Sequence, residues 1–239
     1  MGKLIVLFIA GFIGLSLRYI IVGEFEIDQL LSLLLFPAGS MLVFFIMKWQ
    51  YYKDRDFQPN QSKNKMVTRL GDRVSTTTKQ MYRDKVHIGS YHRFYNKWWQ
   101  RIVADIFDDP GRWYLNLIFT LHNGDRVVFK GENDNKIIGN IAWVIYKNDK
   151  EVGTISTDYS VKNAIKFLES LHLQYGNNTY HFRSYSLRSK TEIYYDNYVI
   201  ATGERAEGAV YELTIDPALK HDWEMLFMVY ILFNYNFSQ

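Results

Sequence analysis

The chain has 239 residues, of which 48% are hydrophobic and 17% aromatic, enough for one sizeable core and an additional apolar segment. It contains no cysteine, which excludes disulfides, thiolate catalysis and cysteine-ligated zinc. The net charge of +3 is small but uneven: residues 48–101 carry 13 lysines and arginines against 4 acidic residues, whereas residues 102–239 carry 13 against 18. The basic excess is therefore confined to one region, directly after an apolar one.

Two apolar runs open the chain. Residues 4–22 and 29–49 each have the length of roughly 20 residues that an α-helix needs to cross a bilayer. Pro37, in the middle of the second run, predicts a kink. The alternative for the first run is a cleavable signal peptide, but no small-residue cleavage site follows it and the second run comes at once. We therefore expect residues 1–50 to form a transmembrane helical hairpin.

The charges that flank these runs predict the orientation of the hairpin. The link, residues 23–28, contains three acidic residues and no lysine or arginine, whereas five basic residues lie between residues 48 and 65. Because basic residues are retained on the cytoplasmic side, we expect a multi-pass protein of the cell membrane with both termini in the cytoplasm. Arg18, toward the outer end of the first run, does not follow this pattern.

The next segment, residues 51–78, is polar, rich in Asn, Gln, Lys and Thr, and shows little apolar periodicity. It predicts a linker that holds one short strand at residues 66–70. We therefore expect the folded domain to comprise residues 79–239.

Residues 79–101 interleave basic and aromatic side chains. Three interpretations are open: stacking on nucleic-acid bases, contact with an anionic membrane surface, and a structural element whose rings point inward while its charges are solvated. No nucleic-acid-binding motif accompanies the pattern, so we expect no nucleic-acid partner. Because the segment follows membrane helices, our working hypothesis is contact with anionic phospholipid. The candidate headgroup ligands are Arg83, Lys85, Arg93, Lys97 and Arg101, and the candidate interfacial aromatic residues are Tyr95, Trp98 and Trp99.

Segments rich in β-branched and aromatic residues follow, separated by turn sequences such as His122-Asn123-Gly124-Asp125. The predicted strands are residues 113–121, 126–131, 136–148, 151–157, 179–185, 191–204 with a bend near Asp196-Asn197, and 209–216. Residues 160–172 instead repeat apolar residues at helical spacing, which predicts an amphipathic surface helix.

The last segment predicts a buried helix, with Asp216 and Pro217 at its start. From Trp223 to Phe233 every side chain except Glu224 is apolar or aromatic, so the helix has no face for water. The run is short for a membrane span, which favours burial in protein. Strands with short turns before such a helix predict a closed antiparallel β-barrel wrapped around it, and hence an α+β, mainly β fold.

Two short segments of this half resemble a known family. Glu151-Val152-Gly153-Thr154-Ile155 is similar to a strand with the pattern x-x-G-x-I, and Asp222-Trp223-Glu224 before Met225–Phe233 is similar to a terminal acidic-then-apolar helix. Residues 80–239 thereby resemble the tubby C-terminal-like superfamily, which includes tubby domains, plant LURP-one-related proteins and phospholipid scramblases. The resemblance implies a barrel of about twelve strands around a central helix. The N-terminal membrane hairpin is not part of the family pattern.

The resemblance implies function only loosely. Tubby domains bind phosphoinositide headgroups through surface Lys and Arg, and scramblases move lipids, but the phosphoinositide-binding residues find no one-to-one match in this sequence.

The sequence shows no motif for catalysis or metal binding. Neither GxSxG, a P-loop nor a dinucleotide fingerprint occurs. No metal-ligand spacing is present among the six histidines, which are His87, His92, His122, His172, His181 and His221. A carboxylate cluster at Asp105, Asp108 and Asp109 is more typical of a turn. We expect no catalytic residues, metal or cofactor.

Together these features predict a membrane-anchored, non-enzymatic cytoplasmic β-barrel whose residues 79–101 bind anionic lipid headgroups at the inner leaflet. Two alternatives remain from the sequence. One is an accessory or interaction subunit with a membrane protein partner, and the other is a lipid scramblase-like activity.

Overall fold

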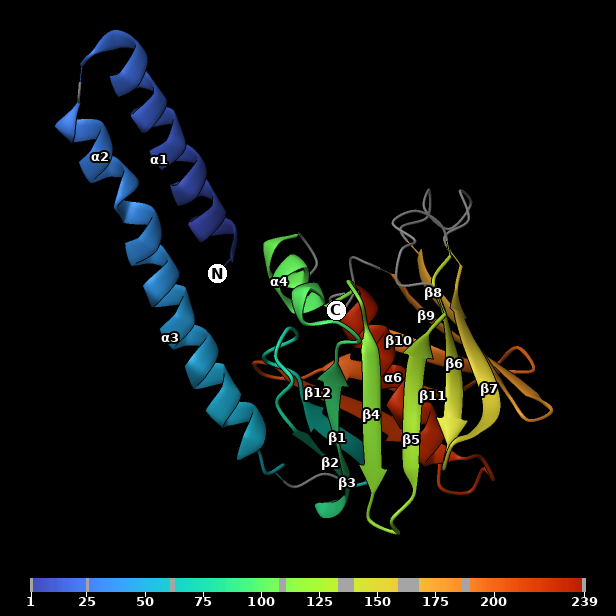
Figure 1. Cartoon of the computed structure of the whole chain (residues 1–239). Helices are drawn as coiled ribbons and strands as arrows, with labels where there is room; N and C mark the ends of the chain where they lie inside the picture. The colour runs from blue at the N-terminus through green and yellow to red at the C-terminus, as the bar shows by residue number, and fades with distance from the viewer. Residues whose placement is uncertain are drawn as a thin grey trace.

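The computed structural model describes residues 2–24, 26–60, 63–107, 111–132, 140–158, 168–185 and 190–237. It consists of a helical hairpin and a β-barrel (Figure 1). The hairpin contains α1 (Gly2–Val22), α2 (Ile27–Leu33) and α3 (Leu35–Arg55). The other two helices described are α4 (Trp98–Ile106), outside the barrel at the end nearest α1, and α6 (Trp223–Phe237), inside it.

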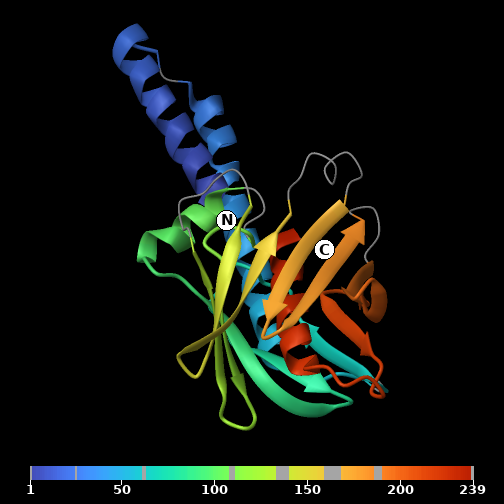
Figure 2. The ribbon, with the colours of Figure 1, turned by 90° about the vertical axis from the view of Figure 1, so that its right-hand side faces the viewer.

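Twelve antiparallel strands close into the barrel. Each pairs with its neighbours in the sequence, and β1 pairs with β12 to complete the ring, so no strand edge stays open. The strands are β1 (Lys65–Arg69), β2 (Lys79–Arg83), β3 (Val86–Phe94), β4 (Asn116–Leu121), β5 (Arg126–Gly131), β6 (Ala142–Lys147), β7 (Lys150–Thr157), β8 (Leu168–Tyr175), β9 (Asn178–Tyr185), β10 (Lys190–Tyr195), β11 (Tyr198–Arg205) and β12 (Val210–Ile215). The predicted closed barrel is confirmed. Figure 2 shows the same ring of strands from its side.

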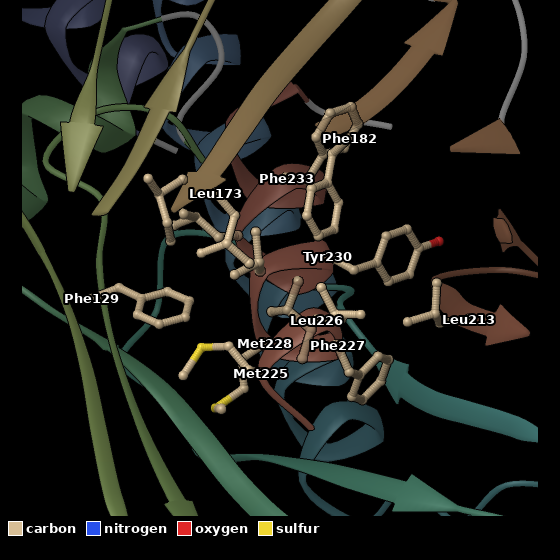
Figure 3. Packing of buried hydrophobic residues seen from close by; sticks show 14 of the residues in the cluster. Phe129, Leu173, Phe182, Leu213, Met225, Leu226, Phe227, Met228, Tyr230 and Phe233 are labelled. Carbon is tan, nitrogen blue, oxygen red and sulfur yellow. The ribbon is translucent and has the colours of Figure 1, made fainter. Parts of the chain in front are cut away.

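The interior of the barrel is filled by α6. All of its residues except Glu224 and Phe237 are buried. Figure 3 shows strand side chains facing the helix, among them Phe182 of β9, whose ring stacks on that of Phe233 with centroids 6.5 Å apart. The prediction that an all-apolar helix must be enclosed by strands is therefore confirmed.

The predicted start of this helix at Pro217 is wrong, because the helix begins at Trp223. The carboxylate of Asp222 caps it by accepting a 3.0 Å hydrogen bond from the Met225 amide. Asp216 has the same kind of side chain, but it accepts the Ala218 amide in a turn that ends β12. Either aspartate could cap a helix, but only the segment after Asp222 is helical and enclosed by the barrel.

The predicted surface helix at residues 160–172 is wrong over its last part. Residues 159–167 lie outside the part of the chain described, and β8 begins at Leu168. Leu171 and Leu173 are fully buried while His172 between them is half-buried, which is the two-residue alternation of a strand. Hydrogen bonding to β7 on one side and β9 on the other outweighs the local helical pattern.

The two N-terminal segments, Gly2–Val22 and Ile27–Arg55, are long and apolar enough to cross a membrane. They pack antiparallel, so that a Cβ added to Gly39 of α3 would lie 3.5 Å from Leu4 of α1. The predicted kink is present between α2 and α3, at Leu34. Its physical cause is Pro37, whose ring excludes the carbonyl of the residue four positions earlier from a regular helix.

The predicted linker, residues 51–78, contains part of the folded structure. α3 continues to Arg55, and β1 is the predicted short strand, which here pairs with both β2 and β12. Four of the five β1 residues are buried: Met66 belongs to the barrel core, and Arg69 contacts Gln50 and Asp54 of α3. The barrel therefore begins at Lys65, earlier than the predicted boundary at residue 79.

A buried ionic cluster joins α3 to the barrel where β1 and β2 separate. The carboxylate of Asp54, fully buried near the end of α3, forms an ion pair with Arg69 and accepts hydrogen bonds from the amides of Gly71 and Asp72, at 3.1 and 2.8 Å. The ammonium of Lys79, also fully buried, lies 4.0 Å from the same carboxylate. One carboxylate thus lies beside two cations and accepts hydrogen bonds from two amides, which fixes α3 against the barrel.

Enclosure of α6 predicts a large stability loss when the helix is truncated. We expect Phe227→Ala to lower the free energy of unfolding by about 3–5 kcal/mol, because the vacated space cannot collapse inside a closed barrel. The measurement is denaturant unfolding of the full chain in neutral detergent, followed by near-ultraviolet circular dichroism. The matched variant Val86→Ala, at a residue that is 67% exposed, should change the free energy of unfolding by no more than about 0.5 kcal/mol. Equal effects would show that α6 is not enclosed.

The ionic cluster gives a second stability prediction. We expect Asp54→Ala to destabilise the chain by about 3–5 kcal/mol, because Arg69 and Lys79 would remain buried without a counter-charge. The neighbouring pair of Arg55 and Asp56 is exposed, so Asp56→Ala should leave the free energy of unfolding nearly unchanged in the same assay. If the free energy of unfolding falls by the same small amount in both variants, the cluster does not hold α3 against the barrel.

Candidate membrane-facing site

The basic and aromatic segment 79–101 forms β2, β3 and the first turn of α4. α4 begins after Lys97, whose amide donates a 3.0 Å hydrogen bond to the side chain of Gln100, which satisfies one of the free donors at the helix start. Gln100 and Ala104 are buried and turn one face of the helix toward the barrel. The opposite face is left for solvent or membrane.

That opposite face combines apolar and basic side chains. Trp98 is 79% exposed and Ile102 51% exposed, and Arg101 lies between them at helical spacing. Lys97 is exposed at the start of the helix, with its ammonium 5.8 Å from the ring of Trp99. We call Lys97, Trp98, Arg101 and Ile102 the α4 face. A large apolar side chain beside cations suits the boundary between headgroups and acyl chains.

The α4 face lies at the level where α1 begins. The Gly2 amide donates a 2.7 Å hydrogen bond to the carboxylate of Asp105, on the next turn of α4. A Cβ at Gly2 would be only 2.9 Å from Ile106, so the two helices touch closely. Figure 1 shows α4 beside this end of α1. If α1 spans the bilayer, α4 therefore lies near the membrane surface at which α1 begins.

The helix α3 continues past this level. Since Gly39 lies beside Leu4, the sixteen residues from Gly39 to Arg55 carry α3 about 24 Å further along the barrel. This extension exposes Trp49, with the Lys53 ammonium 3.7 Å from its ring centre. Tryptophan beside lysine is typical of a membrane–water boundary, but Trp49 lies ten residues beyond Gly39, about 15 Å past the level of α4.

Arg93 is a predicted headgroup ligand that the structure removes from the surface. It is fully buried, and its guanidinium donates hydrogen bonds to the carbonyls of Trp113 and, at 2.6 Å, Arg73. Its charge also lies 4.7 Å from the ring of Tyr95. Arg93 therefore joins the chain segments at the end of the barrel and cannot reach a lipid.

The aromatic residues Tyr95 and Trp99 also have internal roles, so only Trp98 of the three predicted interfacial residues is freely exposed. The Tyr95 hydroxyl donates a 2.8 Å hydrogen bond to the carbonyl of Val74, and burial raises the pKa of Tyr95 to about 12. It therefore stays a donor at every pH the protein meets. Trp99 is half-buried, edge-on to Tyr114 with ring centroids 5.4 Å apart.

Arg83 and Lys85 lie far from the other candidates. Arg83 ends β2 and Lys85 lies in the turn between β2 and β3, while α4 follows the other end of β3. A strand of nine residues separates the two groups by about 27 Å. The five predicted ligands thus divide into an exposed pair on α4, a pair at the opposite end of the barrel and one buried arginine.

Sequence reasoning missed Ile102 and Asp54. The spacing of Trp98 and Ile102, four residues apart with basic residues between, was a readable signal of an amphipathic helix. Asp54 gave no such signal, because only the folded chain brings Arg69 and Lys79 to it. Of the acidic cluster considered as an alternative, Asp105 binds Gly2, and Asp108 and Asp109 lie outside the described residues.

Comparisons with known proteins identify one family. The family model of the Tubby C-terminal like domain matches residues 68–236, more than half of the chain. No curated protein and no solved structure matches the chain. Within the described residues no group of three or more His, Asp or Glu side chains could hold a metal ion. From its closed barrel, its enclosed terminal helix and this match, the chain belongs to the Tubby C-terminal like domain family.

Proposed function

We propose that this protein is a membrane-anchored, non-enzymatic tubby-like domain whose α4 face binds anionic lipid headgroups at the cytoplasmic leaflet. The observation that carries the proposal is the contact of α4 with the first residues of α1, which brings an exposed tryptophan and two exposed cations to the end of a membrane-length helix. Each cation near an anionic membrane surface contributes about 1 kcal/mol, and Trp98 and Ile102 add apolar contact.

The anchor makes such weak contacts effective. Because α3 is fixed to the barrel by the Asp54 cluster and α1 touches α4, the barrel is held at two points near the bilayer. Binding of the α4 face is then an intramolecular event at high effective concentration. The revised ligand set is Lys97 and Arg101, the two exposed cations of the α4 face.

A probe on the α4 face tests this proposal. Ile102→Cys introduces the sole thiol of the chain, to which an environment-sensitive fluorophore is attached. In nanodiscs we expect a larger blue shift of its emission with phosphatidylglycerol present than in phosphatidylcholine alone. Adding Lys97→Gln and Arg101→Gln should reduce this blue shift, because the two cations together contribute about 2 kcal/mol of attraction to the anionic surface. Raised salt should also reduce the blue shift, because it screens that attraction.

The matched control is the double variant Arg83→Gln and Lys85→Gln, which removes the same charge from the opposite end of the barrel. It should leave the fluorescence response unchanged. The proposal fails if this control weakens the response as much as the α4 variants do, or if the probe does not distinguish the two lipids.

Membrane orientation is tested separately, again because the chain has no cysteine of its own. Ile27→Cys lies at the tip of the hairpin, where Ile27 is 63% exposed, and Asp149→Cys lies in the turn before β7. With both termini in the cytoplasm, an impermeant maleimide should label the Ile27 variant in intact cells. It should label the Asp149 variant only after permeabilisation. The reverse pattern would refute the orientation.

A further inference from the structure

A polar hollow lies on the outer surface of the barrel, over β9, β10 and the turn that follows β10. It has a volume of about 200 Å³ and is lined by Thr179, His181, Arg183, Tyr194, Asp196 and Asn197. The strand register builds it: His181 faces Tyr194 across β9 and β10, and Arg183 faces Glu192. On the other side His181 faces His172 of β8. These side chains point away from α6, so the barrel core does not require them.

The guanidinium of Arg183 is the main charge in this hollow. It lies over the ring of Tyr194 at 5.1 Å and 3.5 Å from Nδ1 of His181. Glu192 is opposite in register, but its carboxylate accepts the Tyr194 hydroxyl at 2.6 Å and lies 3.6 Å from the Lys190 ammonium. In the part of the chain that the structure describes, no carboxylate is within ion-pair distance of Arg183. A cation without a counter-ion is thus held at a concave surface.

Two imidazoles extend this cluster. The rings of His172 and His181 meet edge to face with centroids 4.2 Å apart, and Asp158 lies 3.9 Å from His172. Burial lowers the pKa of His181, and the charges of His172 and Arg183 act in the same direction. Neutral His181 has one donor and one acceptor nitrogen. Because an Arg183 N–H faces Nδ1, we infer that Nδ1 accepts and that Nε2 carries the proton.

We propose that this hollow binds a small oxyanion of the phosphate-monoester class, with Arg183, His181 and Thr179 as its hydrogen-bond donors. A guanidinium offers a planar fork that matches two phosphate oxygens, and an imidazole N–H and a hydroxyl can satisfy others. Asp196 also lines the hollow and its carboxylate repels additional negative charge, so the ligand carries a single anionic group. A metal ion is disfavoured, since the described residues provide no group of three ligands for one.

This site is separate from the proposed headgroup site. In an antiparallel barrel successive turns alternate between the two ends, so the turn at Asp196-Asn197 lies at the same end as the turn between β2 and β3. α4 lies at the opposite end. The ligand must therefore come from solution rather than from the membrane that anchors the chain, and the inference does not depend on the function of the α4 face.

The test uses the imidazole ring resonances of the full chain in neutral detergent micelles, titrated with inorganic phosphate. We expect saturable shifts of the His172 and His181 signals and no shift of His92. His92 is the internal control, because it also has an arginine nearby, Arg126, and a pKa lowered by burial, but lines no such hollow. Arg183→Gln should raise the half-saturating phosphate concentration about tenfold or more, and Arg126→Gln should leave it unchanged.

Three outcomes would overturn the proposal. They are equal shifts at all histidines, no saturable shift, and saturation that survives Arg183→Gln while the other resonances show an intact fold. A further arm places the chain in phosphatidylglycerol nanodiscs without phosphate, where we expect no shift of His181. A shift with lipid alone would reject a ligand from solution. Failure of the α4 variants in the lipid assay would leave the phosphate titration unaffected, so the two hypotheses fail separately.

Discussion

The constraint on which this structure depends is the apolar surface of α6 on every side. A helix with no polar face is stable only where side chains surround it completely. Twelve strands whose ends pair through β1 and β12 provide such a wall and also remove the open edges that would invite aggregation. Burial of α6 and closure of the barrel therefore stabilise each other, because neither has a soluble alternative by itself.

The cluster of Asp54, Arg69 and Lys79 lies where the chain leaves β1 and enters β2. Buried ion pairs contribute little net stability relative to apolar packing, but removing one partner is costly. Here the cluster fixes a geometry, since Asp54 belongs to α3 and its partners belong to the barrel. The hairpin and the barrel are joined by a fixed contact, and the position of α4 relative to α1 follows from it.

The basic and aromatic segment shows how a single composition serves several purposes. Arg93 and Lys79 are buried within the end of the barrel, Arg83 and Lys85 lie at the other end, and Lys97 and Arg101 remain on the α4 face. No single one of the three interpretations of residues 79–101 holds for every residue of the segment. The interior interpretation is correct for Arg93 and Tyr95, and the membrane hypothesis is carried by the residues of α4 alone.

The sequence by itself determined the elements whose patterns are local: two membrane-length helices, most barrel strands, the kink at Pro37 and the enclosure of α6. It also indicated the family, through features such as Gly153, where a Cβ would overlap the carbonyl oxygen of Gln174 on β8. Only the tertiary structure decided that residues 168–172 form a strand and that β1 belongs to the barrel. The reason is that strand pairing, buried charge pairs and exposed surfaces depend on residues far apart in the chain, whose meeting no local pattern records.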